Sequence, residues 1–206
     1  MKVLIINGSP RSKGNCSRLV DEILSVFNPL GIESEVVSIG NKDIRGCMAC
    51  SYCATHDGCV FKDIVNETSL KLKEADGLIL LSPVYYASPN GSLIAFLDRL
   101  FYSANFDLSM KVGAAFAVAR RAGTTCSFDV LNKYFTISGM PLVSGDYWNN
   151  GFGSKQGEIE QDKEGLRNAI MVAKRMAFLM KAIEEGKEKY PELLEEDPHV
   201  WTNFFH

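Results

Sequence analysis

Four of the six cysteines in this 206-residue chain lie within one stretch of thirteen residues. They are Cys47, Cys50, Cys53 and Cys59, in the spacing C-x2-C-x2-C-x5-C, and Gly46 and Gly58 bracket them. Four thiolates on a short loop can surround a 4Fe-4S cube, and closely spaced C-x2-C runs are typical of such ligation. The spacing therefore favours an iron–sulfur cluster. A structural zinc ion and uncoordinated thiols remain the alternatives.

A second group of candidate residues follows the first apolar run of the chain. The segment from Gly8 to Ser17 reads G-S-P-R-S-K-G-N-C-S and leads into a helical pattern. Its Gly, Ser and Asn residues offer short donors at the positive end of a helix, and Arg11 adds a charged fork. It is neither a Walker A loop nor a G-x-G-x-x-G turn. The segment predicts a phosphate site, with an ordinary strand-to-helix turn as the alternative.

Two further loops follow later apolar runs. The loop from Ser82 to Gly91 contains two prolines and two tyrosines, which make a stiff surface suited to an aromatic ring. The loop from Ala119 to Thr125 is again rich in backbone donors. Because ligands bind beyond the carboxyl ends of parallel strands, all three loops are expected at one sheet edge. A phosphate pocket beside an aromatic slot predicts a mononucleotide with a large ring.

The elements that must position these loops alternate between strands and helices. Apolar runs predict buried strands at 2–7, 77–81 and 112–118, residues 32–39 read as a further strand, and a short fifth strand is expected to start at 141–143. Helical spacing of apolar residues predicts helices at 16–27, 66–75, 92–103, 127–136 and 163–185. This alternation indicates an α/β fold with a doubly wound parallel sheet.

Length and composition predict one domain over residues 1–206, with a cysteine-rich insertion at 46–59 and a tail at 187–206. Aromatic residues in the tail, Trp201, Phe204 and Phe205, are expected to pack on the domain or on a dimer partner. Lys plus Arg is 22 and Asp plus Glu is 25, a net charge of −3 that argues against nucleic-acid or membrane partners. Clustered cysteines and an N-terminal apolar run too short for a signal peptide predict a cytoplasmic protein.

Several motifs together resemble the NADPH-dependent FMN reductase family over nearly the whole chain. They are Gly8-Ser9-Pro10-Arg11, Ser82-Pro83-Val84-Tyr85, Phe96-Leu97-Asp98-Arg99, Arg121-Ala122-Gly123 and Gln161-Asp162-Lys163-Glu164-Gly165-Leu166. The resemblance implies a flavodoxin-like fold, in which a five-stranded parallel sheet of order 2-1-3-4-5 carries helices on both faces. It also implies FMN as the cofactor.

Carried over by the motifs, the resemblance assigns three sets of FMN contacts. The phosphate set is Ser9, Arg11, Asn15 and Ser17, with Cys16, where the family commonly has Thr, able to offer its backbone N–H. The set flanking the isoalloxazine is Pro83, Val84, Tyr85, Tyr86, Ala87 and Ser88, and Arg121, Ala122, Gly123 and Thr124 complete the ring site. No catalytic side chain is predicted, because hydride passes directly to or from the flavin while the protein supplies orientation and electrostatics.

The cysteine spacing resembles the compact motif of the iron–sulfur flavoproteins, a branch of this family with one 4Fe-4S cluster beside FMN. This likeness implies a homodimeric or homotetrameric redox protein that passes electrons from NAD(P)H or ferredoxin to an acceptor. A cluster-free NAD(P)H-dependent FMN, quinone or azo-compound reductase is one alternative. A non-enzymatic flavodoxin-like carrier is the other, although this chain is longer and less acidic than expected of one.

Overall fold

A parallel β-sheet forms the centre of the protein in the computed structural model, which describes residues 1–195, 198, 200 and 202. In spatial order its strands are β2 (Glu33–Ser38), β1 (Lys2–Asn7), β3 (Gly77–Tyr85), β5 (Val112–Ala119) and β6 (Asn150–Phe152). A two-residue strand, β4 (Ser88–Pro89), pairs antiparallel with the end of β3. The order of the parallel strands confirms the predicted 2-1-3-4-5 arrangement.

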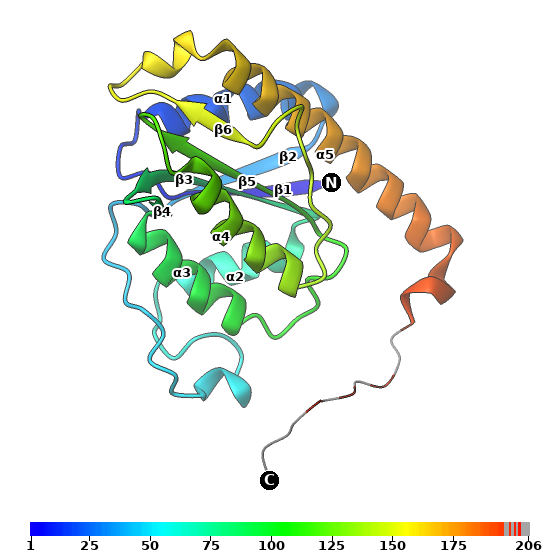
Figure 1. The fold of residues 1–206 in the computed structure, drawn as a ribbon. Coiled ribbons are helices and arrows are strands. Elements are labelled where there is room, and N and C mark those ends of the chain that lie inside the picture. Colours follow the sequence, from blue (N-terminus) through cyan, green and yellow to red (C-terminus); the bar gives the residue numbers. More distant parts are fainter. Residues whose placement is uncertain (196–197, 199, 201, 203–206) are drawn as a thin grey trace.

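Helices cover both faces of this sheet, as Figure 1 shows. They are α1 (Asn15–Phe27), α2 (Ile64–Glu74), α3 (Gly91–Tyr102), α4 (Thr124–Ile137) and α5 (Lys163–Lys189). Alternate residues of β1 enter opposite core layers. Val3 and Ile5 pack with α1 and α5, whereas Leu4 and Ile6 pack with the other three helices. A strand buried on both faces needs apolar residues at every position, which explains the uninterrupted apolar runs.

The fifth strand is not where the sequence pattern put it, so that prediction was wrong. Residues 141–143 make a single isolated parallel bridge, between Gly113 and Leu142. The strand itself is β6, which pairs with the end of β5. Val143 is buried in the core, so the apolar run marks burial rather than strand pairing. β6 is a three-residue edge strand with a buried asparagine and a glycine, and it therefore gives no apolar signal.

β1 has the predicted bounds, and the other element boundaries differ from the predicted ones by a few residues. β3 continues to Tyr85 because its end pairs with β4, and α5 continues to Lys189. The predicted packing of Trp201, Phe204 and Phe205 lies outside the described residues. Within the described part of the chain, no helix has both the length and the apolar character needed to cross a bilayer.

Candidate functional site

A hollow of about 610 Å³, partly open to solvent, lies at the carboxyl edge of the sheet. We call it the sheet-edge hollow. Its lining residues are Ser9, Arg11, Asn15, Cys16, Pro83, Val84, Tyr85, Val118, Ala119, Arg120, Gly153 and Ser154. The ends of β1, β3 and β5 and the residues just after them therefore meet, as parallel strand ends must. A fourth segment, the two residues after β6, joins them.

The loop after β1 is held in shape by its own hydrogen bonds. Ser9 N donates to Asn7 Oδ1 at 2.9 Å, and Arg11 N donates to Ser9 Oγ at 3.2 Å. Ser17 Oγ donates to Ser12 O at 2.9 Å, so the hydroxyl of this predicted phosphate contact already donates its hydrogen bond within the loop. The Arg11 guanidinium reaches the carbonyl of Ser154 at 3.3 Å across the hollow. The loop is thus preformed, with a cation at its rim.

The helices differ in how their N-termini are capped. The side chains of Asp63, Asn90 and Asp162 cap α2, α3 and α5 by accepting hydrogen bonds from backbone N–H groups. In contrast, α1 and α4 begin after Gly14 and Gly123 with no side-chain cap and no acidic residue in the first turn. These two helices follow β1 and β5; the first residues of α1, Asn15 and Cys16, line the hollow, whereas no residue of α4 does. Their positive ends are therefore open to an anionic ligand.

The loop after β3 is a tight hairpin with an unusual backbone. Tyr86 and Ala87 link β3 to β4 with φ of 51° and 58°, values that two-residue hairpin turns normally give to Asn or Gly. Gly123, whose φ is 90°, lies against this turn, and a Cβ there would come within 2.7 Å of the Ala87 Cα. The loops after β3 and β5 therefore interlock through a position that requires glycine.

The structure brings some predicted residues into the hollow and leaves others around it. Seven of the predicted FMN contacts line it: Ser9, Arg11, Asn15, Cys16, Pro83, Val84 and Tyr85. Eight do not: Ser17, Tyr86, Ala87, Ser88, Arg121, Ala122, Gly123 and Thr124. Five lining residues were not among the predicted FMN contacts, although two of them, Ala119 and Arg120, belong to the predicted donor-rich loop: Val118, Ala119, Arg120, Gly153 and Ser154. Arg120 adjoins the predicted Arg121, whereas the last two follow the strand that the sequence pattern misplaced.

Cys16 has no accessible, reactive thiol. Its side chain is 2% exposed, and burial raises its pKa to about 12. A thiol in this state stays protonated and is a poor nucleophile. What Cys16 can offer a ligand is its backbone N–H in the first turn of α1.

A second hollow, of about 350 Å³ including the space open to solvent, lies in the loop between β2 and α2. We call it the cysteine hollow. Cys47, Cys50, Cys53 and Cys59 all line it, together with Arg99, Tyr102 and Ser103 from the end of α3. Cys47 and Cys50 are exposed, and the other two are half-buried. None of the lining residues is shared with the sheet-edge hollow.

The backbone of the cysteine loop turns repeatedly around this hollow. Ala49 and Ser51 have φ of 52° and 57°, while Cys50 between them keeps a negative φ. Such alternation directs successive N–H groups to one side and forms the concavities that many phosphate and iron–sulfur sites use. Non-glycine residues in this region are strained by about 1–3 kcal/mol each. The strain lies in the loop segment that carries Cys47, Cys50 and Cys53.

Four cysteines are the ligand number of either a 4Fe-4S cluster or a structural zinc ion. Among the described residues, no three His, Cys, Asp or Glu side chains converge as one metal ion requires. A zinc ion draws four sulfurs onto one centre, whereas a 4Fe-4S cube gives each thiolate its own iron and keeps the sulfurs apart. His56, inside the loop, stacks on Tyr52 with ring centroids 4.0 Å apart. Four cysteines lining one hollow supply the ligand number that a 4Fe-4S cluster needs.

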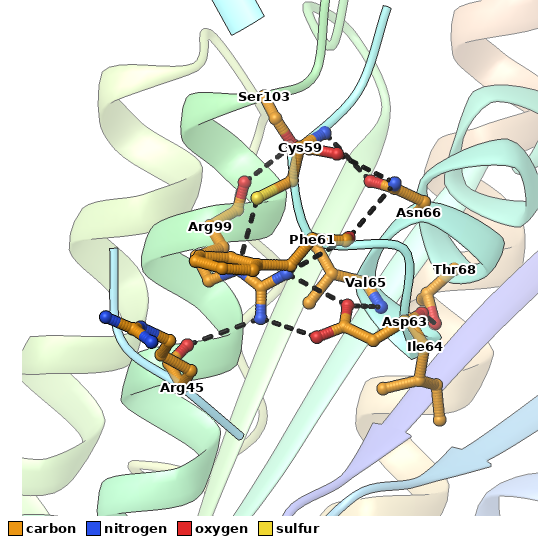
Figure 2. A network of polar contacts seen from close by, with 10 residues as sticks. All are labelled: Arg45, Cys59, Phe61, Asp63, Ile64, Val65, Asn66, Thr68, Arg99 and Ser103. Carbon is orange, nitrogen blue, oxygen red and sulfur yellow. Dashed lines mark hydrogen bonds and ion pairs between the residues drawn. The ribbon is translucent and has the colours of Figure 1, made fainter. Parts of the chain in front are cut away.

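The last cysteine is fixed to the fold by an asparagine of α2, as Figure 2 shows. Cys59 N donates to Asn66 Oδ1 at 2.8 Å, and Asn66 Nδ2 donates back to Cys59 O at 2.9 Å. Gly58, with φ of 77°, brings the chain close to the same side chain. Nothing in the local sequence pattern singled out Asn66.

Comparisons with known proteins identify the family of the chain. Residues 1–155 match the sequence profile of the NADPH-dependent FMN reductase family. An iron–sulfur flavoprotein of Methanocaldococcus jannaschii is 36% identical over 194 residues, which cover 90% of this chain and 100% of that protein. An iron–sulfur flavoprotein of Methanosarcina thermophila is 34% identical over 194 residues, covering 92% of this chain and 100% of that protein.

Solved structures support the fold. RosB, bound to the intermediate 8-demethyl-8-formylriboflavin-5'-phosphate, has a TM-score of 0.66 at 18% identity, covering 99% of this chain and 92% of RosB. An archaeal flavodoxin has a TM-score of 0.56 at 18% identity, covering 86% of this chain and 99% of the flavodoxin. At these identities the likeness establishes a flavodoxin-like fold.

Proposed function

The chain belongs to the NADPH-dependent FMN reductase family, in its iron–sulfur flavoprotein branch, and we propose that it is an FMN-dependent oxidoreductase carrying one 4Fe-4S cluster. The observation that carries this proposal is the presence of two separate hollows in one chain. One combines the open N-terminus of α1 with Arg11 and Tyr85, and the other is lined by four cysteines.

The sheet-edge hollow is suited to a flavin mononucleotide. Arg11 and the open N-terminus of α1 would hold the phosphate, and Arg120 offers a second cation on the opposite wall. Tyr85, 46% exposed, would offer an aromatic face to the isoalloxazine. Bound FMN exchanges electrons either in pairs or singly. The protein would bind the flavin, orient its ring against the hairpin and leave one side open to a donor.

The cysteine hollow would hold the cluster through Cys47, Cys50, Cys53 and Cys59. The cluster would supply one-electron exchange. Because Cys47 and Cys50 are exposed, an external carrier could approach that side of the loop. We propose NAD(P)H or ferredoxin as electron donor, in a single-domain, cytoplasmic homodimer or homotetramer.

Metal and flavin analysis of the anaerobically purified protein tests this proposal. We expect about four iron and four acid-labile sulfide per chain, with flavin absorbance in the same sample. Zinc in place of iron would mean that the four cysteines hold a structural zinc ion and not a cluster. Flavin without iron or zinc would leave a cluster-free NAD(P)H-dependent reductase.

Steady-state turnover separates an enzyme from a carrier. The protein with bound FMN is mixed with NADH or NADPH and a quinone, and nicotinamide absorbance is followed. Sustained oxidation identifies a nicotinamide-dependent reductase. Reduction of the protein by reduced ferredoxin alone identifies ferredoxin as the donor.

A further inference from the structure

A fully buried arginine contacts one of the four loop cysteines. Arg99, near the end of α3, is 1% exposed, and its Nε donates a hydrogen bond to Cys59 Sγ at 3.3 Å. Figure 2 shows the guanidinium in the middle of a polar network between α3 and the cysteine loop. A guanidinium carries its charge at every pH a protein meets. A permanent cation is therefore buried against a candidate cluster ligand.

The other nitrogens of this guanidinium are also engaged. Nη1 and Nη2 donate to the two carboxylate oxygens of Asp63 at 2.7 and 2.9 Å, a bidentate pair. Nη1 also donates to the carbonyl of Arg45 at 3.3 Å. The ring of Phe61 lies over the guanidinium, with its centroid 5.0 Å from Cζ. These contacts hold the orientation that aims Nε–H at the sulfur.

The four sulfurs are not equivalent. Within the described residues, Cys59 is the loop cysteine whose Sγ accepts a hydrogen bond from a charged donor. Cys53 Sγ instead lies 3.7 Å from the carbonyl of Tyr102, a contact that needs a protonated thiol and is lost in a thiolate. The reduction potential of a cluster depends on hydrogen bonds to its sulfurs, on nearby charge and on solvent exposure. Arg99 supplies both a hydrogen bond and a nearby positive charge at the sulfur of Cys59.

We propose that Arg99 is a positioning residue that raises the reduction potential of the cluster through its charge and its hydrogen bond to Cys59 Sγ. This inference rests on the proposed cluster. A one-electron reduction adds negative charge, and a buried cation 3.3 Å from a ligand sulfur stabilises that charge with little screening. The negative charge of Asp63, whose side chain is 34% exposed, cancels part of the effect of Arg99 on the reduction potential.

Because Arg99 is paired with a carboxylate, the proposal predicts potential shifts of opposite sign for two different substitutions. Removing the cation lowers the potential, whereas neutralising Asp63 leaves the cation uncompensated and raises it. Asn also caps helices about as well as Asp, so Asp63→Asn keeps the N-cap of α2. A side chain with a merely structural role would not move the potential in opposite directions in these two variants.

The test is an EPR-monitored redox titration of anaerobically purified wild-type protein, Arg99→Gln, Asp63→Asn and the control Arg45→Gln. Arg45 carries the same charge near the same loop, but it is exposed. We expect Arg99→Gln to disfavour cluster reduction at least tenfold, a fall of about 59 mV. Asp63→Asn should favour reduction, and Arg45→Gln should change the equilibrium less than twofold.

Iron content measured on the same samples separates the two proposals. Wild-type protein without iron overturns the cluster, and the role of Arg99 with it. Full iron with an unchanged potential in Arg99→Gln overturns the role of Arg99 alone, as do shifts of the same sign in both variants. If Arg99→Gln does not retain iron, the proposal is tested with Asp63→Asn alone. A reduction potential of Asp63→Asn that is not higher than that of the wild-type protein then overturns it.

Discussion

The sheet-edge hollow and the cysteine hollow are built in different ways. The first lies at the ends of strands that are buried on both faces, so the core fixes the position of each wall. The second is enclosed by a loop whose residues are mostly exposed and whose backbone is strained at Ala49 and Ser51. A wall fixed by the core is ready before its ligand arrives. A loop with few buried contacts depends on a small number of anchors and on the group that it binds.

One helix joins the two regions. At its N-terminus, Asn90 Nδ2 donates to Gly8 O at 2.9 Å, and Asn90 N donates to Ser82 Oγ at 2.8 Å, which ties α3 to two loops of the sheet edge. Near its other end, Arg99 reaches Cys59. With a rise of about 1.5 Å per residue, the nine-residue step between Asn90 and Arg99 spans about 14 Å. The comparison therefore predicts separable sites on a shared rigid element.

The largest expected effect is the loss of the cluster from Cys53→Ala. Iron should fall from about four to below one per chain, while FMN content is unchanged, because the two hollows share no residue. Iron and flavin assays on anaerobically purified protein measure both. Cys126→Ala, which removes an exposed cysteine outside the loop, is the control and should retain both. Loss of FMN together with iron would break the proposed separation.

Arg11→Ala tests the phosphate end of the sheet-edge hollow. Loss of a charge-assisted hydrogen bond to phosphate costs about 1.5–3 kcal/mol, so FMN affinity should fall about 10- to 150-fold. Fluorescence titration of the apoprotein with FMN measures this change. Lys13→Ala, in the same loop but not lining the hollow, should alter affinity far less. An equal effect of the two substitutions would mean that only the net charge of the loop matters.

Gly123→Ala tests whether the sheet edge is as rigid as its construction implies. At a φ of 90°, with a new Cβ 2.7 Å from the Ala87 Cα, we expect the unfolding free energy to fall by about 1–3 kcal/mol. Gly186→Ala in α5, where a Cβ meets nothing within 4 Å, should instead stabilise the protein by about 0.5–1 kcal/mol. Denaturant unfolding compares them. A neutral Gly123→Ala would show that the hairpin yields easily.

Tyr85→Ala should produce the smallest of these effects. An aromatic pair contributes about 0.5–1.5 kcal/mol, so FMN should bind about 2- to 12-fold more weakly, with a shifted flavin absorbance band. Tyr86→Ala is the comparison, because Tyr86 is fully exposed and does not line the hollow. If Tyr86→Ala alone alters the flavin spectrum, the isoalloxazine lies on the outer side of the hairpin.

Much of the fold could be predicted from the sequence because its signals are local. The strand at 2–7 has the predicted bounds, and the four longest strands and all five helices occupy the predicted regions. Burial on both faces requires an unbroken apolar run, and such a run is visible without knowledge of the partners. The fifth strand was missed because a short edge strand obeys no such requirement.

The candidate sites likewise combine features that are visible in the sequence with contacts that are visible only in the tertiary structure. The sequence by itself determined the loop after β1, the tyrosine loop and the four cysteines, since each is a contiguous pattern of chemically suited residues. Only the tertiary structure placed Ser154 beside Arg11, 143 positions away in the chain. It alone buried Arg99 against Cys59 and Asp63, 40 and 36 positions away. Such contacts depend on how helices pack on the sheet, and no local periodicity encodes that packing.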